Sequence, residues 1–483
     1  MKQTMWVIGV LVLLAGCQNV PYRSAGFSDG PDCKSLYNRI DDLDDEDEKI
    51  SDEDRNSHCW RRAHEARDRH DLLFVEFDDQ GWVQGSGSSE RKGRAAGGNP
   101  DGDYLDEFER QLNTLHERYK HRGLTLVVFV HGWHHNARAD DENVRDFRHL
   151  LGEVAHAENR MTGDELGRRV VGLYVGWRGE SLRLPYVNSL TFWDRKAVAE
   201  HVAQGSVREM FARLDRLRDE SRRADGQPGT RLLTIGHSFG GLLVYNALSG
   251  ELLRAAAHSD GNHSAARLGD LVVIVNPAIE GTRYEPLLAA GQRPKEYRTD
   301  QLPVVVIATS KADWATGLAF PAARVFSTLF ESQTWVQWLA GINTVGHSDR
   351  YTTHHLEKCA DKDVDCKNAC RQAEPESRRY QKSATLTKNK PAMDKRLEIE
   401  YRHMLPMAER GATTKEYFCG QMQLTATDKW TPVNNPFWVV STSGDIMKGH
   451  NDIFNNYFVG FVRQLYLGIL AQEKAAKATG KRN

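Results

Sequence analysis

Residues 231–248 read Arg-Leu-Leu-Thr-Ile-Gly-His-Ser-Phe-Gly-Gly-Leu-Leu-Val-Tyr-Asn-Ala-Leu, and this stretch decides the fold. It opens with an apolar run of strand length and closes with the composition of a buried helix. Ser238 stands between Gly236 and Gly240 at the corner between the two elements. Glycines suit these positions because the serine backbone is strained in such a turn, and a larger neighbour would collide with the strand or the helix. The pattern predicts a nucleophilic serine; a tight structural turn is the alternative.

An upstream apolar run, Leu124–Val130, predicts a strand that is buried on both faces, as in a parallel sheet. The sequence His131-Gly132-Trp133-His134-His135 follows it directly. Backbone N–H groups of such a loop are suited to bind a developing negative charge, because they are fixed in advance. The closely spaced histidines leave a metal site as the alternative, although zinc ligands usually have helical spacing or a distant third partner.

A histidine follows the last predicted strand of the chain. Residues 437–441 have strand character, His450 lies in the loop after them, and apolar residues from Phe454 to Ile469 then recur at helical spacing. A base that takes and returns a proton works best with a pKa near neutrality, which histidine provides. The alternative is a histidine at the start of a helix with no chemical task.

Three carboxylates are candidates for the acid that would hold this histidine. Asp313 follows the apolar run 302–309, Glu280 follows the run 271–275, and Asp445 lies close to the histidine in sequence. Such an acid fixes the imidazole tautomer and stabilises the imidazolium. The position after the penultimate strand favours Asp313, and the other two remain open.

These motifs, in the order serine, acid, histidine, resemble the α/β-hydrolase superfamily in its serine esterase and lipase-like branches. The resemblance extends from about Asp71 to about Leu470. It implies that Ser238 is the nucleophile, His450 the general base and Asp313 the acid. In branches that carry the acid one strand earlier, Glu280 would take that place.

The same resemblance implies an oxyanion hole formed by the backbone amides of Phe239 and Trp133, and it implies no metal or cofactor. The alternation of strands, such as 72–77 and 170–175, with helices, such as 105–119, predicts an α/β fold. We expect a mostly parallel sheet with helices on both faces.

The amino terminus predicts a location. An apolar run from Met5 to Leu14 is too short to span a bilayer and fits the core of a signal peptide. The sequence Leu14-Ala15-Gly16-Cys17 resembles a bacterial lipobox, which implies that residues 1–16 are removed and that Cys17 is lipidated. Gln18 in place of aspartate implies the outer membrane, facing the periplasm. An ordinary secreted protein is the alternative.

Six further cysteines suggest disulfides in an oxidising compartment. We expect Cys33 to pair with Cys59. Cys359, Cys366, Cys370 and Cys419 would pair in one of three ways, and a zinc site that uses the first three is the alternative.

The predicted organisation is an acidic amino-terminal segment, 17–65, a hydrolase domain, 66–475, and a polar tail, 476–483. The domain contains a cysteine-bearing insertion, 315–435, which is too long for a connection. Its aromatic residues could form a cap over the site or the insertion's own core.

The sequence as a whole predicts a serine hydrolase of carboxylic esters that acts through an acyl-enzyme. An acyltransferase with the same three residues is an alternative, and so is a lipid-anchored binding or assembly protein without turnover. The expected partners are an ester or lipid-like small molecule and, through the anchor, a membrane. The net charge of −2 argues against nucleic acid, and nothing in the sequence indicates an oligomeric state.

Overall fold

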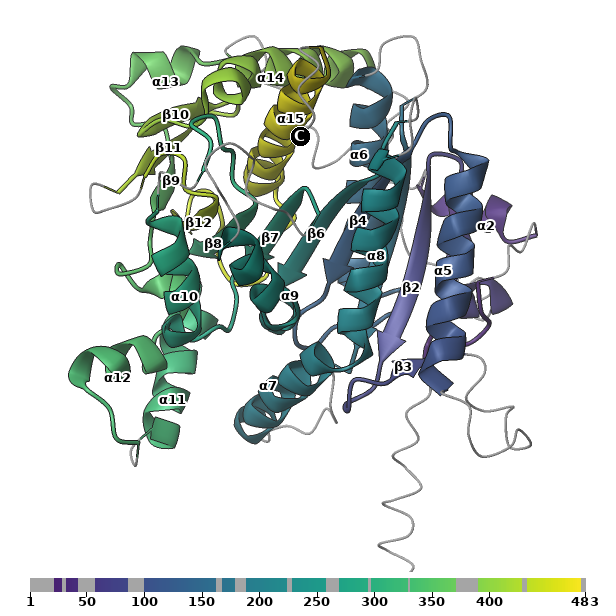
Figure 1. The fold of residues 1–483 in the computed structure, drawn as a ribbon, viewed down its shortest axis with the longest axis horizontal. Coiled ribbons are helices and arrows are strands. Elements are labelled where there is room, and N and C mark those ends of the chain that lie inside the picture. The colour runs from purple at the N-terminus through teal and green to yellow at the C-terminus, as the bar shows by residue number, and fades with distance from the viewer. Residues whose placement is uncertain are drawn as a thin grey trace, which may run out of the picture.

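A twelve-stranded mixed sheet runs through the molecule in the computed structural model (Figure 1). The structure describes residues 21–27, 32–41, 57–85, 100–161, 167–178, 188–223, 228–257, 269–293, 297–328, 331–370, 390–427 and 432–478. The strands are β1 (His64–Ala66), β2 (His70–Phe77), β3 (Val83–Gln84), β4 (Leu124–Val130), β5 (Arg169–Trp177), β6 (Arg231–His237), β7 (Leu271–Val275), β8 (Val305–Ser310), β9 (His354–Lys358), β10 (Lys415–Phe418), β11 (Met422–Ala426) and β12 (Phe437–Thr442).

The centre of the sheet is parallel and its two rims are antiparallel. The strand order is β1-β2-β5-β4-β6-β7-β8-β12-β9-β11-β10, with β3 paired to β2. The eight neighbouring strands β2, β5, β4, β6, β7, β8, β12 and β9 are mutually parallel. Strands β1, β3, β10 and β11 pair antiparallel. Because parallel strands end at the same edge, the loops that follow β4, β6, β7, β8 and β12 meet there.

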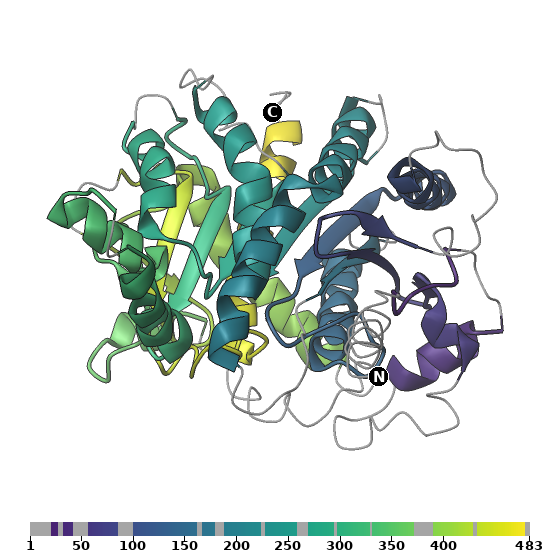
Figure 2. The same cartoon turned by 90° about the horizontal axis from the view of Figure 1, so that it is seen from below.

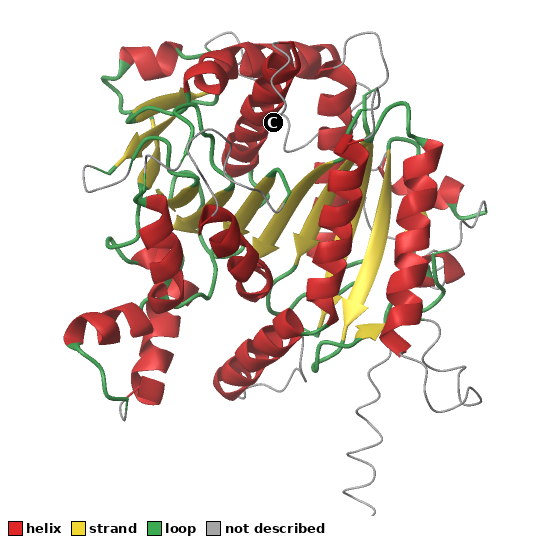
Figure 3. Cartoon of the chain, in the orientation of Figure 1, coloured by secondary structure: helices red, strands yellow, loops and turns green. Residues whose placement is uncertain are grey.

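Helices cover both faces of the sheet, as Figure 3 shows and as the sequence predicts. The helices are α2 (Lys34–Asp41), α5 (Pro100–Arg118), α6 (Glu142–Met161), α7 (Asn188–Gln204), α8 (Ser206–Arg223), α9 (Phe239–Ala257), α10 (Gly281–Gly291), α11 (Phe320–Thr328), α12 (Trp335–Ile342), α13 (Val364–Asn368), α14 (Lys390–Arg410) and α15 (Asn456–Ala478). Short helical turns are η1 (His58–Arg61), η3 (Ala315–Ala319) and η4 (Val345–His347).

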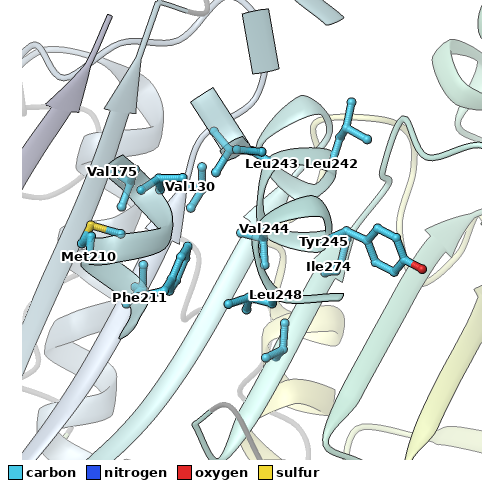
Figure 4. Close-up of a cluster of buried hydrophobic side chains, with 14 of the residues drawn as sticks. Val130, Val175, Met210, Phe211, Leu242, Leu243, Val244, Tyr245, Leu248 and Ile274 are labelled. Carbon is cyan, nitrogen blue, oxygen red and sulfur yellow. The ribbon is translucent and has the colours of Figure 1, made fainter. Parts of the chain in front are cut away.

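Two apolar clusters divide these helices between the faces. Side chains of α5 and α7 to α10 pack on one face, and those of α6, α14 and α15 pack on the other. Figure 4 shows part of the first cluster, in which Phe211 of α8 and Val244 of α9 lie near Val130 of β4. The unbroken apolar strands follow from this double coverage, since both faces are removed from water.

The predicted insertion contains two different parts. Strands β9, β10 and β11 come from it and extend the main sheet beyond β12, and α14 contributes to the core with α15. The segment with η3, α11 and α12 instead lies beyond the carboxyl edge of the sheet (Figures 1 and 2). Of the apolar residues in this segment, Phe326, Leu329 and Phe330 lie outside the described side chains.

The described part of the chain contains three disulfides. The expected pair Cys33–Cys59 is confirmed. Among the three ways to pair the other four cysteines, the structure has Cys359–Cys366 and Cys370–Cys419. These bonds occupy the sulfur atoms that a zinc site would need.

The predicted signal peptide, Cys17 and the acidic run from Asp42 lie outside the described residues, as do residues 479–483 of the tail. Among the helices that the structure describes, none combines the length and the apolar character that crossing a bilayer requires.

Candidate active site

Ser238 occupies a strained corner between β6 and α9. Its φ angle is 55°, in the left-handed region that residues with a side chain rarely adopt. The turn is held by Ser238 N–H donating to the Val275 carbonyl at 2.9 Å and by Leu242 N–H donating to the Ser238 carbonyl at 3.1 Å. The corner therefore presents the serine at the carboxyl edge of the sheet.

The positions of Gly236 and Gly240 beside the serine have no room for a side chain. A Cβ on Gly240 would lie 2.2 Å from the Val130 carbonyl oxygen, and one on Gly236 would lie 2.9 Å from the Gly240 carbonyl oxygen. Both contacts are with backbone atoms, which cannot turn aside as a flexible side chain can. The strand, the turn and the first turn of α9 can pack this closely only with glycine at these positions.

Residues from three loops form one chain of hydrogen bonds. His450, in the loop between β12 and α15, lies with Nε2 at 2.8 Å from Ser238 Oγ. Its Nδ1 lies 2.9 Å from Asp313 Oδ2, in the loop after β8. Because a carboxylate can only accept, Nδ1 carries the hydrogen, and Nε2 is left to accept from the serine hydroxyl. The three groups thus stand in the arrangement of a nucleophile, a base and an orienting acid.

Asp313 is buried and firmly held. Its Oδ1 accepts from the amides of Ala315 at 2.9 Å and Thr316 at 3.3 Å, and its Oδ2 also accepts from the Thr316 hydroxyl. Burial alone would raise the pKa of this carboxyl, but the hydrogen bonds from His450 and Thr316 outweigh burial, and the pKa lies below its ordinary value. The carboxylate therefore remains charged beside the imidazole.

The other two acid candidates lie elsewhere. Glu280 is bound by Lys196 Nζ at 2.9 Å and by Arg283 Nε at 2.9 Å. Burial would raise the pKa of Glu280, but these cations lower it below its ordinary value. Asp445 is exposed, and the partner of His450 Nδ1 is Asp313.

The His-Gly loop after β4 packs directly against the serine. A Cβ on Gly132 would lie 3.0 Å from Ser238 Cβ and 2.9 Å from His237 Nδ1. The next ring, that of Trp133, lies with its centroid 6.3 Å from the ring of Phe239. The rings of the two residues whose amides were predicted to form the oxyanion hole therefore lie close to each other.

The histidines of this loop do not converge on one point. His131 is buried, with Nδ1 at 2.8 Å from the Gly132 carbonyl and Nε2 accepting from the Trp177 amide at 3.2 Å. Burial lowers the pKa of His131 to about 4. His135 instead contacts Asp141 at 3.1 Å and Asn143 at 3.1 Å. These two rings have separate hydrogen-bond partners, so a shared metal ion is not supported.

Within the described residues, the group of side chains close enough to hold a metal is Asp32, Cys33, His58 and Cys59. Its two cysteines are bonded to each other, which leaves one carboxylate and one imidazole as ligand groups. The cluster belongs to the amino-terminal segment.

Asn276, which sequence analysis missed, connects the end of β8, before Asp313, to the loop that carries His450. Its Nδ2 donates to the His450 carbonyl at 2.8 Å and, more weakly, to the Gly449 carbonyl at 3.3 Å. Its Oδ1 accepts from the Ser310 amide at 2.9 Å. The φ angle of Asn276 is 46°, so this residue too is strained. A polar residue directly after the apolar strand 271–275 was the available signal.

His237 holds the same carbonyl from the other side. Its Nε2 lies 2.9 Å from the His450 carbonyl oxygen. Burial, and then the neighbouring His450, keep the pKa of His237 well below its ordinary value, so the ring is neutral and donates through Nε2. Asn276 and His237 together fix the backbone of the residue whose imidazole meets Ser238.

No protein-family model and no curated protein matches the sequence. Among solved structures, phospholipase PlaB from Legionella pneumophila is similar at 15% identity over 50% of this chain and 48% of that one, with a TM-score of 0.24. PlaB in complex with thio-NAD gives 16% identity, 50% and 47% coverage and a TM-score of 0.22. The matched part is about half the length of that phospholipase. At these TM-scores the likeness carries no argument.

Proposed function

We propose that this chain is a serine hydrolase that cleaves carboxylic esters. The observation that carries the proposal is the continuous chain of hydrogen bonds from Asp313 through His450 to Ser238 Oγ. It ends at a strained serine on the carboxyl edge of the sheet, where open α/β sheets bind their ligands. A protein that only binds has no need of these three groups in this order.

In the proposed reaction, Ser238 Oγ attacks the acyl carbon while His450 Nε2 takes the hydroxyl proton. Asp313 stabilises the imidazolium through Nδ1–H. His450 then returns the proton to the leaving alkoxide, and an ester of Ser238 remains. Water, deprotonated by the same nitrogen, attacks this acyl-enzyme and releases the carboxylic acid and free Ser238.

The proposed oxyanion hole consists of the backbone amides of Phe239 and Trp133. The first begins α9, whose positive end favours the developing charge. The second follows Gly132, which packs against the serine. Two fixed donors stabilise the tetrahedral intermediate more than they stabilise the neutral ester.

We also propose that Cys17 carries a lipid and anchors the protein in the bacterial cell envelope, at the outer membrane facing the periplasm. The three disulfides agree with an oxidising compartment. More than one acyl chain on the anchor would make attachment stable. Lipid-like esters would then be within reach of the enzyme.

A fluorophosphonate probe tests the proposed activity, because it reacts with an activated serine. The wild-type chain and a Ser35→Ala control should be labelled, whereas folded Ser238→Ala should not. An absence of label on folded wild-type protein would favour the non-catalytic binding role. Hydrolysis measured with an added alcohol then separates the alternatives: predominant transfer to the alcohol would assign an acyltransferase.

A further inference from the structure

Exposed apolar side chains gather at one edge of this molecule. Among the residues that the structure describes, nine large apolar side chains are exposed, and all but Val364 and Val433 lie at the carboxyl edge of the sheet. That edge holds the candidate active site. The seven residues form two patches, one on each side of the site.

The first patch, here the α12 patch, consists of Trp314, Leu318, Trp335, Val336 and Leu339. Trp314, Leu318 and Trp335 are 69%, 69% and 67% exposed. A capping box between Thr334 and Gln337 fixes the start of α12, and the ring of Trp335 stacks on that of Trp338 at 4.8 Å. Trp335, Val336 and Leu339 thus stand on the ordered helix α12, whereas Leu318 belongs to the turn η3 and Trp314 is its N-cap residue. Helix α12 lies beyond the carboxyl edge of the sheet (Figure 1).

The second patch, here the β2 patch, consists of Trp82 and Tyr22, which are 51% and 45% exposed. The Trp82 amide donates to Asp78 Oδ1 at 2.9 Å in the turn after β2. The Tyr22 amide donates at 3.2 Å to Glu76 Oε2, near the end of the same strand. Four strands separate β2 from β8, which leads to Trp314, so the two strands are about 24 Å apart at the usual spacing.

We propose that both patches rest on a lipid bilayer, with the carboxyl edge of the sheet facing the membrane and the site between the two contacts. Tryptophan and tyrosine prefer the membrane–water interface, where an apolar ring and a polar N–H or O–H group are both satisfied. Separate contacts on either side of a site suit a broad flat surface better than a single groove-bound partner.

The path of the chain supports the same orientation. Cys17 precedes Tyr22 by five positions, and five residues span at most about 18 Å. A lipid on Cys17 would therefore hold the edge that carries Tyr22 close to the bilayer. Because the net charge of the chain is −2, apolar contact rather than attraction to anionic lipid is expected to dominate. The inferred membrane contact does not depend on the proposed function. Only the inference that the substrate is a lipid-like ester rests on it.

Tryptophan fluorescence of the full chain, attached to phosphatidylcholine vesicles with brominated acyl chains, tests the contact directly. Bromine quenches only rings that reach the acyl region. We expect quenching in the wild type, and at least a twofold smaller quenching in the Trp82→Phe/Trp314→Phe/Trp335→Phe variant. Trp60→Phe, which removes a buried ring, is the matched control and should leave the quenching unchanged. Equal quenching in all three proteins, or none, would overturn the proposal and leave the patches to a protein partner.

Rates on two substrates give a second measurement. The variant Trp335→Ser/Val336→Ser/Leu339→Ser should hydrolyse a vesicle-borne ester at least about tenfold more slowly. Its rate of hydrolysis of a water-soluble p-nitrophenyl ester should be unchanged. Val364→Ser/Val433→Ser is the control and should change neither rate. An equal loss on both substrates would mean that α12 shapes the substrate pocket, which would overturn the proposal. If the wild type hydrolyses neither ester, the proposed function fails, and the quenching alone decides the membrane contact.

Discussion

Two aspartate–histidine pairs in this chain have nearly the same geometry and different surroundings. His450 Nδ1 lies 2.9 Å from Asp313, and His64 Nε2 lies 2.8 Å from Asp71. The second nitrogen of His450 meets the hydroxyl of Ser238, whereas that of His64 meets the side-chain amide of Gln111 at 3.1 Å.

The surroundings explain why one pair is suited to chemistry. The His450 side chain is 20% exposed, whereas that of His64 is fully buried. Asp71 is also bound by Arg169 at 2.7 Å, so this pair belongs to a buried ionic cluster that joins β1, β2 and β5. An aspartate–histidine pair becomes a candidate for catalysis when it meets a nucleophile that substrate can reach.

The largest expected difference between the pairs follows from removing each imidazole. His450→Ala should lower kcat/KM for a p-nitrophenyl ester by at least about a thousandfold, because Ser238 loses its base. His64→Ala should keep activity per folded molecule and lose about 2 kcal/mol of unfolding free energy, because buried polar partners lose a hydrogen bond. Steady-state kinetics and urea unfolding of both variants measure the contrast. Near-normal hydrolysis by His450→Ala would contradict the assignment of the base.

Changing each acid to its amide sharpens the same contrast. Asp313→Asn should lower kcat by about 10²- to 10⁴-fold, since the amide no longer fixes the tautomer or stabilises the imidazolium. Asp71→Asn leaves the buried Arg169 without its charge partner and should cost about 3 kcal/mol of stability. Glu280→Gln is measured beside them. If it abolished activity while Asp313→Asn kept it, the acid would belong to the earlier strand.

The amino-terminal pair lies in a region tied by a disulfide. Cys33→Ala/Cys59→Ala opens a loop of 26 residues and should lower the unfolding free energy by about 3 kcal/mol. Cys59 lies in η1, directly before β1, which contains His64. We therefore expect the variant to lose stability and to keep its activity per folded molecule. Calorimetry with parallel ester assays tests this separation: a fall in activity per folded molecule would show that the amino-terminal region also supports the site.

A smaller effect is expected from Asn276, which supports the Asp313–His450 pair. Asn276→Gly keeps a backbone that tolerates a φ of 46° and removes the amide that joins the acid and base loops. We expect a fall in kcat of about tenfold, little change in KM and an altered pH profile. An unchanged kcat and profile would mean that His237 and the backbone hold His450 without Asn276.

A gradual pH dependence of stability is expected from buried histidines outside the Asp313–His450 pair. Burial lowers the pKa of His354 to about 3 and that of His131 to about 4. The unfolded chain binds protons below about pH 6.5, where these folded rings stay neutral, so stability falls as pH drops from about 6.5 to 4. Each ring contributes up to about 1.4 kcal/mol per pH unit. Urea unfolding of His354→Asn between pH 7 and 5 should show a shallower dependence; an unchanged slope would contradict the account.

The sequence predicted the elements that have strong local signals. The serine corner, the buried strands and the Cys33–Cys59 bond all follow from patterns within a few residues or from a count of cysteines. The corner requires glycines because of close backbone contacts, and this requirement is visible in the sequence itself.

Other features depend on contacts between distant segments. The sequence could not show that β9, β10 and β11 would join the main sheet, because edge pairing depends on what lies beside β12. It left Glu280 open because both acids follow apolar strands. The two are separated by long-range contacts: His450 meets Asp313, and Lys196 meets Glu280. Asn276 was missed because its partners lie 34 and 174 positions away.

The most direct test of the central claim is to trap the acyl-enzyme. A p-nitrophenyl ester mixed rapidly with the full chain should release a burst of about one nitrophenol per enzyme. Mass spectrometry of the quenched sample should then find the acyl group on the peptide that contains Ser238, and no adduct in Ser238→Ala. Hydrolysis without an adduct on Ser238, or an adduct on another residue, would contradict the account.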